Sequence, residues 1–171
     1  MYTIRKIESE IELPYDLINI NTGGERFIFR FISFDENQTD RSIEMGGVTG
    51  KFGIIYQSKG IDCNFECDIT VGNVYAFNYS LDTAYDLMSG RNAVSVLSDY
   101  GDTLNRTNLT IRFDSKGHCL MDGHFKNKDD LYKSAVSFSF EIDQTDVLDM
   151  LVSMNKFFEE LIKIQGHNNF I

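Results

Sequence analysis

Two histidines and an aspartate in the second half of this chain have the greatest potential for chemistry. His118, Asp122 and His124 fall at alternate positions of an expected strand, so their side chains would share one face. Imidazole and carboxylate groups placed together can hold a zinc ion or act as acid and base. Their spacing matches no short metal-ligand motif. The sequence therefore predicts no metal and no cofactor, and an enzyme with a His118/Asp122/His124 site is kept as an alternative.

The cysteines and a glycine-rich segment indicate structure in preference to catalysis. Cys63 and Cys67 share an apolar strand face, and Cys119 has no identifiable catalytic partner, so we expect all three to be buried. An odd number of cysteines does not suit a disulfide framework and favours a reducing compartment. The segment 46–51 lacks the spacing of a phosphate-binding loop and precedes a strand where a helix would be needed. We expect no catalytic residue.

Acidic side chains form the remaining candidate site. Residues 61–71 alternate without a break, which predicts a strand with an apolar face and a face of carboxylates and polar groups. Polar loops around 35–40 and 99–105 would extend this acidic surface if they converge on it. A solvated surface with no partner is the alternative for any single residue. The candidate partner-binding residues are Asp62, Glu66, Asp68, Asp35, Glu36, Asp40, Asp99 and Asp102.

The composition is that of one folded domain, spanning 1–171, with an excess of negative charge. The chain has 26 acidic and 16 basic residues, for a formal net charge of −10. Such a field opposes binding to nucleic acid or to an anionic membrane and favours a basic protein partner. Acidity that serves only solubility is the alternative. Because no apolar run is long enough for a membrane helix and no leader opens the chain, we expect a cytoplasmic protein.

Residue periodicity predicts an α+β fold with an antiparallel sheet or sandwich-like core and two helices, the longer one C-terminal. One helix is expected over 73–89, with Asn73 as its N-cap. The other begins after Asp143 or Thr145 and has an apolar stripe that includes Leu148 and Leu151. A hairpin turn is expected over 114–117. Strands are expected over 3–13, 15–21, 26–34, 51–58, 61–71, 93–97, 109–113, 118–125 and 134–142.

A resemblance adds an expectation of function. The segment FSFEIDQT at 138–145, followed by a hydrophobic helix, resembles the C-terminal signature of the WapI-type bacterial immunity proteins. The order of elements over roughly the last two thirds of the chain is also similar. The resemblance implies a non-catalytic immunity protein whose toxin partner is a nuclease acting on RNA, and nucleases are commonly basic. The signature is expected to mark a structural junction, and it carries over no contact residue.

The sequence thus leaves three functions open. The leading one is an immunity protein that neutralises a cognate bacterial toxin domain by shape and charge. The second is a phage or mobile-element inhibitor that blocks a nuclease by acidic mimicry of nucleic acid. The third is the enzyme already described. A toxin gene beside this one would favour the first, a prophage neighbourhood the second, and a cleft lined by the histidines the third.

Overall fold

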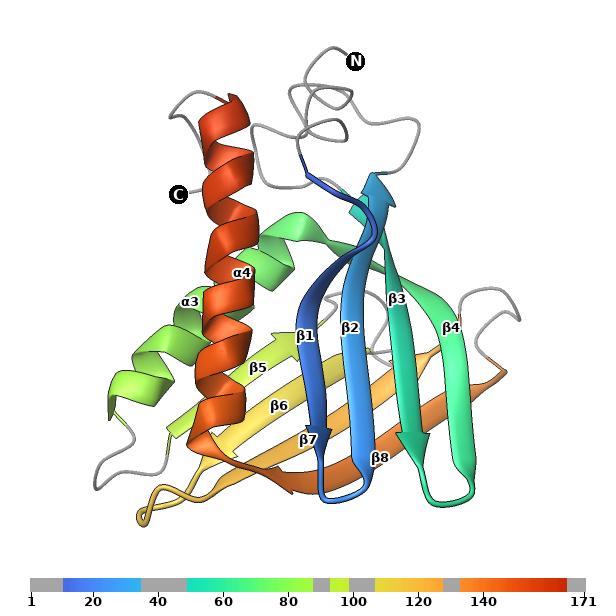
Figure 1. Cartoon of the computed structure of the whole chain (residues 1–171), viewed down its shortest axis with the longest axis vertical. Coiled ribbons are helices and arrows are strands. Elements are labelled where there is room, and N and C mark those ends of the chain that lie inside the picture. Colours follow the sequence, from blue (N-terminus) through green and yellow to red (C-terminus); the bar gives the residue numbers. More distant parts are fainter. Residues whose placement is uncertain (1–10, 35–48, 88–92, 99–106, 128–132, 166–171) are drawn as a thin grey trace.

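Two antiparallel sheets and two helices make up the described part of the chain, so the expected α+β, sandwich-like fold with the longer helix C-terminal is confirmed. The computed structural model describes residues 11–34, 49–87, 93–98, 107–127 and 133–165 (Figure 1). The strands of the first sheet are β1 (Tyr15–Thr22), β2 (Glu25–Phe34), β3 (Thr49–Ser58) and β4 (Ile61–Thr70). The strands of the second are β5 (Ala93–Ser98), β6 (Asn108–Phe113), β7 (Cys119–Lys126) and β8 (Ala135–Ile142).

The two halves of the chain repeat one order of elements. Strands β1–β4 form a meander and are followed by helix α3 (Val71–Leu87). Strands β5–β8 form a second meander and are followed by helix α4 (Gln144–Gln165). Within each sheet, every strand therefore pairs with a strand next to it in the sequence. Neither described helix combines the length and apolarity that a membrane span requires.

Aromatic side chains join the two sheets. Phe27 of β2 lies 5.7 Å from Phe125 of β7 and 5.0 Å from Phe138 of β8, measured between ring centroids. Tyr56 of β3 stacks on the Phe138 ring at 4.6 Å. Phe27 and Phe125 are fully buried, and Phe138 is 8% exposed. The alternating face predicted for 134–142 is thus the face by which the second sheet packs on the first.

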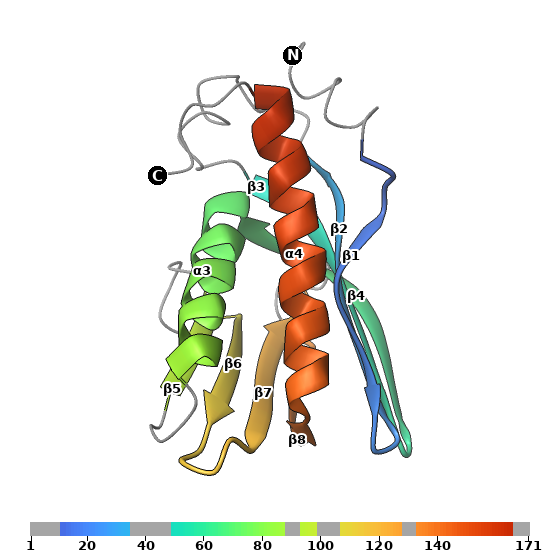
Figure 2. The same cartoon turned by 60° about the vertical axis from the view of Figure 1, so that its left-hand side comes forward.

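The helices lie side by side and cover the side on which the two sheets diverge (Figure 2). Phe157 of α4 packs against Tyr15 of β1 and Phe31 of β2, with ring centroids 5.4 and 5.2 Å apart. Tyr85 of α3 meets Phe113 of β6 edge-on at 6.5 Å. One cluster of buried residues therefore includes both sheets and both helices. The sides of the two helices that face away from the sheets carry exposed residues.

The segment at 138–145 forms the junction between β8 and α4, as expected. The Asp143 carboxylate accepts a hydrogen bond of 2.9 Å from the Asp146 amide, and the Asp146 carboxylate accepts one of 3.0 Å from the Asp143 amide. Asp143 is therefore the N-cap of α4. The predicted apolar stripe was wrong at Leu148, which is 45% exposed, and it omitted Phe157, which is 1% exposed. The helix is rotated toward β1, which brings Phe157 inward.

The junction between β4 and α3 differs from the prediction. Helix α3 begins at Val71, and the Thr70 hydroxyl accepts a hydrogen bond of 3.1 Å from the Asn73 amide. Thr70, not Asn73, therefore caps this helix. The predicted apolar face of β4 is buried at Cys67 and Ile69, whereas Ile61 is 46% exposed. Strand β4 is an edge strand of the first sheet, and its beginning is less covered than its end.

The expected first strand over 3–13 is not found in the part that is described. Residues 11–13 precede β1 without strand structure, and residues 3–10 lie outside the described residues. The strands expected over 15–21, 26–34, 51–58, 93–97, 109–113, 118–125 and 134–142 are confirmed to within a few residues at their ends. On the outer face of β2, Ile28 is buried and Arg30 is half-buried.

Candidate functional site

The structure gives His118, Asp122 and His124 three separate partners. His118 lies between the predicted 114–117 hairpin turn and β7, and its Nδ1 lies 2.9 Å from Oδ2 of Asp114. His124 Nδ1 lies 2.7 Å from the Ser137 hydroxyl oxygen on β8. Among the described residues, no group of three or more His, Cys, Asp or Glu side chains is arranged to hold a metal ion. In the described part of the chain, the three side chains therefore contact different neighbours and do not form the metal site considered from the sequence.

Asp114 and Asp122 hold structure in this hairpin. The Asp114 carboxylate accepts hydrogen bonds from the amides of His118 and Lys116, which lower its pKa even though slight desolvation acts in the opposite direction. Asp122 is ion-paired with Arg112 across β6 and β7. Partial burial alone would raise the pKa of Asp122, but hydrogen bonds from Ser139 and Arg112 outweigh it and lower the pKa. Both carboxylates are therefore anionic partners within the fold.

The cysteines are free and largely in the core. Cys67 and Cys119 are each 2% exposed, and Cys63 is half-buried. Burial raises the pKa of the Cys119 thiol to about 11, and the carboxylates of Asp143, Asp114 and Asp146 contribute to the rise. At neutral pH this thiol is protonated and is a poor nucleophile.

The predicted acidic strand is β4, at the edge of the first sheet, and the neighbouring strands β2 and β3 carry cations. Asp62 accepts a hydrogen bond of 3.3 Å from the side chain of Gln57, which in turn accepts one of 3.1 Å from Arg26. Asp68 stands opposite Lys51 in the β3–β4 register, and Glu66 stands opposite Gly53. Five of the predicted residues lie outside the described residues, namely Asp35, Glu36, Asp40, Asp99 and Asp102.

The same outer face carries a further ion pair on β1 and β2. Arg30 Nε lies 2.9 Å from Oδ1 of Asp16, and both side chains are about one-third exposed or less. The carboxylates described on this face, at 16, 62 and 66, are accompanied by three cations, at 26, 30 and 51, and position 68 belongs to the same face by its register opposite Lys51. The carboxylates predicted on β4 therefore belong to a surface of nearly balanced charge, which we call the sheet face. Its residues are Asp16, Arg26, Arg30, Lys51, Asp62, Glu66 and Asp68.

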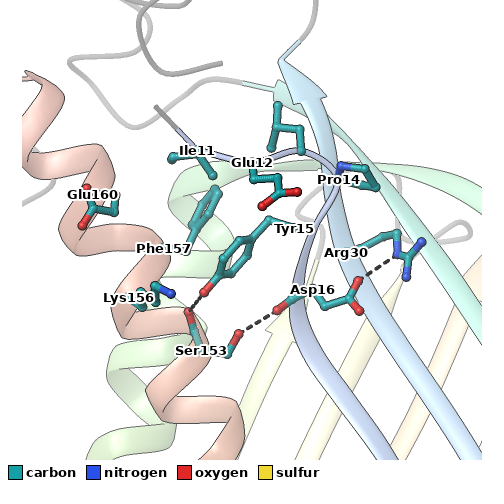
Figure 3. A pocket seen from close by; sticks show the side chains of 11 residues that line it. Ile11, Glu12, Pro14, Tyr15, Asp16, Arg30, Ser153, Lys156, Phe157 and Glu160 are labelled. Carbon is teal, nitrogen blue, oxygen red and sulfur yellow. Dashed lines mark hydrogen bonds and ion pairs between the residues drawn. The ribbon is translucent and has the colours of Figure 1, made fainter. Parts of the chain in front are cut away.

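A cavity of about 630 Å³ lies between the start of β1 and α4 (Figure 3). Its polar groups are largely engaged within the fold. The Tyr15 hydroxyl donates a hydrogen bond of 3.0 Å to the Ser153 carbonyl, and the Ser153 hydroxyl donates one of 2.6 Å to the Asp16 carbonyl. Lys156 contributes an exposed ammonium group at the rim. These contacts attach β1 to α4, and we assign this cavity a structural role.

The outer side of the two helices has a different character. Five large apolar side chains are exposed in the described part of the chain, and four of them, Tyr79, Leu87, Leu148 and Val152, lie on α3 or α4. Apolar groups gathered on one layer and bordered by polar groups are typical of protein interfaces. Tyr79 is 69% exposed and Val152 is 60% exposed. Among the described residues, most of the exposed apolar surface therefore lies on the two helices, and the sheet face contributes none of these five side chains.

Unbalanced negative charge borders this apolar surface. Asp82, Asp86 and Glu159 are exposed, and none of the three has a hydrogen-bond or ion-pair partner among the described residues. The sequence of α3 contains no Lys, Arg or His. We call this surface the helical face, and it consists of Tyr79, Asp82, Asp86, Leu148, Val152, Asn155 and Glu159.

Sequence reasoning did not find the helical face. The signals were present in two forms: a seventeen-residue helix with two aspartates and no basic residue, and a stripe in which Leu148 and Val152 recur one turn apart. Leu148 was assigned to the core because it is apolar, and Val152 was not included in the predicted stripe. Which side of α4 faces outward depends on its contact with β1, and periodicity does not specify that contact.

Comparison with known proteins adds no family to these observations. No model of a known protein family matches the chain, and no curated protein matches it. The WapI-type resemblance stays a prediction.

Proposed function

We propose that this protein is a non-catalytic immunity protein that binds and neutralises a basic bacterial toxin domain, a nuclease by class. The observation that carries the proposal is the helical face, where Asp82, Asp86 and Glu159 are unpaired among the described residues and lie on the same two helices as the exposed apolar side chains. Asp82 and Glu159 line one groove together with the exposed Tyr79 ring. An interface with an apolar centre and a rim of one charge sign suits a partner of the opposite sign. The toxin is expected to present lysines and arginines around an apolar patch.

The net charge supports the same proposal through association kinetics. A formal charge of −10 attracts a cationic protein at long range and speeds its encounter with the helical face. A toxin must be captured before it reaches its substrate, so a fast association is useful. The field is screened by salt over about 10 Å at 0.1 M ionic strength. The association rate constant should therefore fall as salt is added.

Binding without catalysis agrees with the state of the reactive groups that are described. The Cys119 thiol has a pKa of about 11, and Asp122 is held by Arg112. The His118 and His124 side chains contact Asp114 and Ser137. An inhibitor that works by occupancy needs none of these groups to react.

The test is a stoichiometric titration of toxin activity. A candidate toxin domain encoded beside the gene is purified, and its nuclease activity is measured against increasing amounts of this protein. The proposal predicts that activity falls linearly and ends at a fixed molar ratio, and that co-expression restores growth of cells that express the toxin. Continued toxin activity at a large molar excess of this protein would contradict the proposal. Inactivation by far less than one equivalent would contradict it as well, because that result requires turnover.

A further inference from the structure

A small groove separates α3 from α4 within the helical layer. Its volume is about 180 Å³, well below the range of roughly 300–1,000 Å³ typical of drug-sized ligand sites. The groove is thus of a size for one side-chain head group. Its lining consists of aromatic rings, carboxylates and amides, contributed by Tyr75, Asn78, Tyr79, Asp82, Asn155, Phe158 and Glu159.

The groove contains a buried acceptor with no donor. Asn78 is 5% exposed, and its side-chain nitrogen donates a hydrogen bond of 2.7 Å to Oδ1 of Asn155. Its own Oδ1 is buried and accepts no hydrogen bond. An unpaired buried acceptor is destabilising, and an apolar residue of similar size would avoid this cost. An asparagine at this position is explained if a donor arrives from outside.

The other side chains that line the groove indicate which kind of hydrogen-bond donor would fit it. Asp82 and Glu159 bring negative charge and have no partner among the described residues. Tyr79 presents an exposed ring, and Tyr75 packs edge-on against Phe158 at 5.1 Å. None of the described residues that line the groove is Lys, Arg or His. A planar cation with several N–H donors satisfies carboxylates, an amide oxygen and aromatic faces together.

We propose that the α3–α4 groove receives the guanidinium group of an arginine from the basic partner. This inference rests on the proposed function and names the anchor of that interaction. Arginine suits the groove better than lysine because its guanidinium is flat, stacks on aromatic rings and is more weakly hydrated than an ammonium. Asn78 lines the groove, so a guanidinium seated there donates to its Oδ1 while the Asn78 side-chain nitrogen keeps Asn155 as its acceptor. Asp82 and Glu159 then neutralise the charge from the rim.

The test uses two short peptides of equal charge, acetyl-Gly-Arg-Gly-amide and acetyl-Gly-Lys-Gly-amide, titrated into the full chain at constant ionic strength. Backbone amide signals are followed by NMR. The inference predicts that the arginine peptide shifts signals of groove residues and binds several-fold more tightly than the lysine peptide. Asn78→Leu should weaken arginine binding about tenfold while leaving the unfolding midpoint unchanged or raising it.

Two further variants make the test decisive. Asn64→Leu removes an exposed amide from β4, far from the groove in the fold, and should bind the arginine peptide as the wild type does. Tyr79→Ala removes an exposed ring and should weaken arginine binding several-fold without loss of folding, which covers the case of an Asn78→Leu variant that fails to fold. Equal binding of both peptides, or undiminished arginine binding by the folded groove variants, would overturn the inference.

The outcomes separate this inference from the proposed function. Selective arginine binding together with failure to inhibit any neighbouring toxin would contradict the immunity proposal and leave the groove assignment intact. Stoichiometric inhibition of the toxin without arginine selectivity would leave the immunity proposal intact and reject the groove.

Discussion

The helical face and the sheet face both expose carboxylates, but their surroundings differ. On the sheet face, Asp16 is ion-paired with Arg30, and a chain of hydrogen bonds joins Arg26 to Asp62 through Gln57. On the helical face, Asp82, Asp86 and Glu159 have no such partners among the described residues. The number of carboxylates along one strand therefore does not show where the surface is negative. Cations on the adjacent strands determine the net charge of that part of the surface.

The difference has a physical origin in the two kinds of element. Side chains directly opposite each other in an antiparallel sheet lie about 4.5–5.5 Å apart between Cβ atoms, so opposite charges there stabilise the pairing. On α3, Asp82 and Asp86 are one turn apart and repel each other at a cost of about 0.2–0.5 kcal/mol. This cost is small enough to be tolerated. A basic partner would remove it.

The largest effect on the free energy of unfolding is expected from a change that removes the packing of α4 against the first sheet. Phe157 is 1% exposed and packs against Tyr15 and Phe31, so Phe157→Ala should lower the free energy of unfolding by about 3–5 kcal/mol. The matched change Val152→Ala, at a position 60% exposed on the other side of α4, should cost less than about 0.5 kcal/mol. Urea unfolding of the two variants measures both. Similar losses of unfolding free energy for the two variants would mean that the outer side of α4 also packs within the fold. The helical face would then not be free to bind a partner.

A smaller effect, on the rate of association with the toxin, is expected when cations are removed from the sheet face so that its carboxylates are left unbalanced, as they are on the helical face. The double change Arg26→Gln and Lys51→Gln removes two of its three cations and leaves Asp62, Glu66 and Asp68 in place. We expect the toxin to associate about two- to threefold faster at low salt, because the added field is long-ranged, with an unchanged dissociation rate. Stopped-flow mixing measures the two rates. A slower dissociation would show that the sheet face contacts the toxin directly.

The elements of the fold could largely be predicted from the sequence because each has a clear period. The alternation of 134–142 predicts β8 and its buried face, and Asp143 was one of two expected N-caps of α4. The start of α3 was placed two residues late because Thr70 completes the strand and caps the helix at once. The partition of the strands into two sheets depends on long-range packing that no local period contains.

The candidate site was less accessible to sequence reasoning. Asp62, Glu66 and Asp68 were correctly placed on one strand, but the cations at 26, 30 and 51 are 11 to 42 positions away and become neighbours only through strand pairing. Asn78 gives no sequence signal, since an asparagine inside a helix is ordinary. Its unpaired oxygen becomes evident only when α4 is packed over it.

The most direct test of the account compares two triple variants whose net charge changes by the same amount. One is Asp82→Lys, Asp86→Lys and Glu159→Lys on the helical face, and the other is Asp62→Lys, Glu66→Lys and Asp68→Lys on the sheet face. The dissociation constant of each folded variant with the cognate toxin is measured in the same buffer. We predict that the helical-face variant binds about 100-fold more weakly than the sheet-face variant. An equal loss of affinity in the two, or a greater loss in the sheet-face variant, would contradict the account.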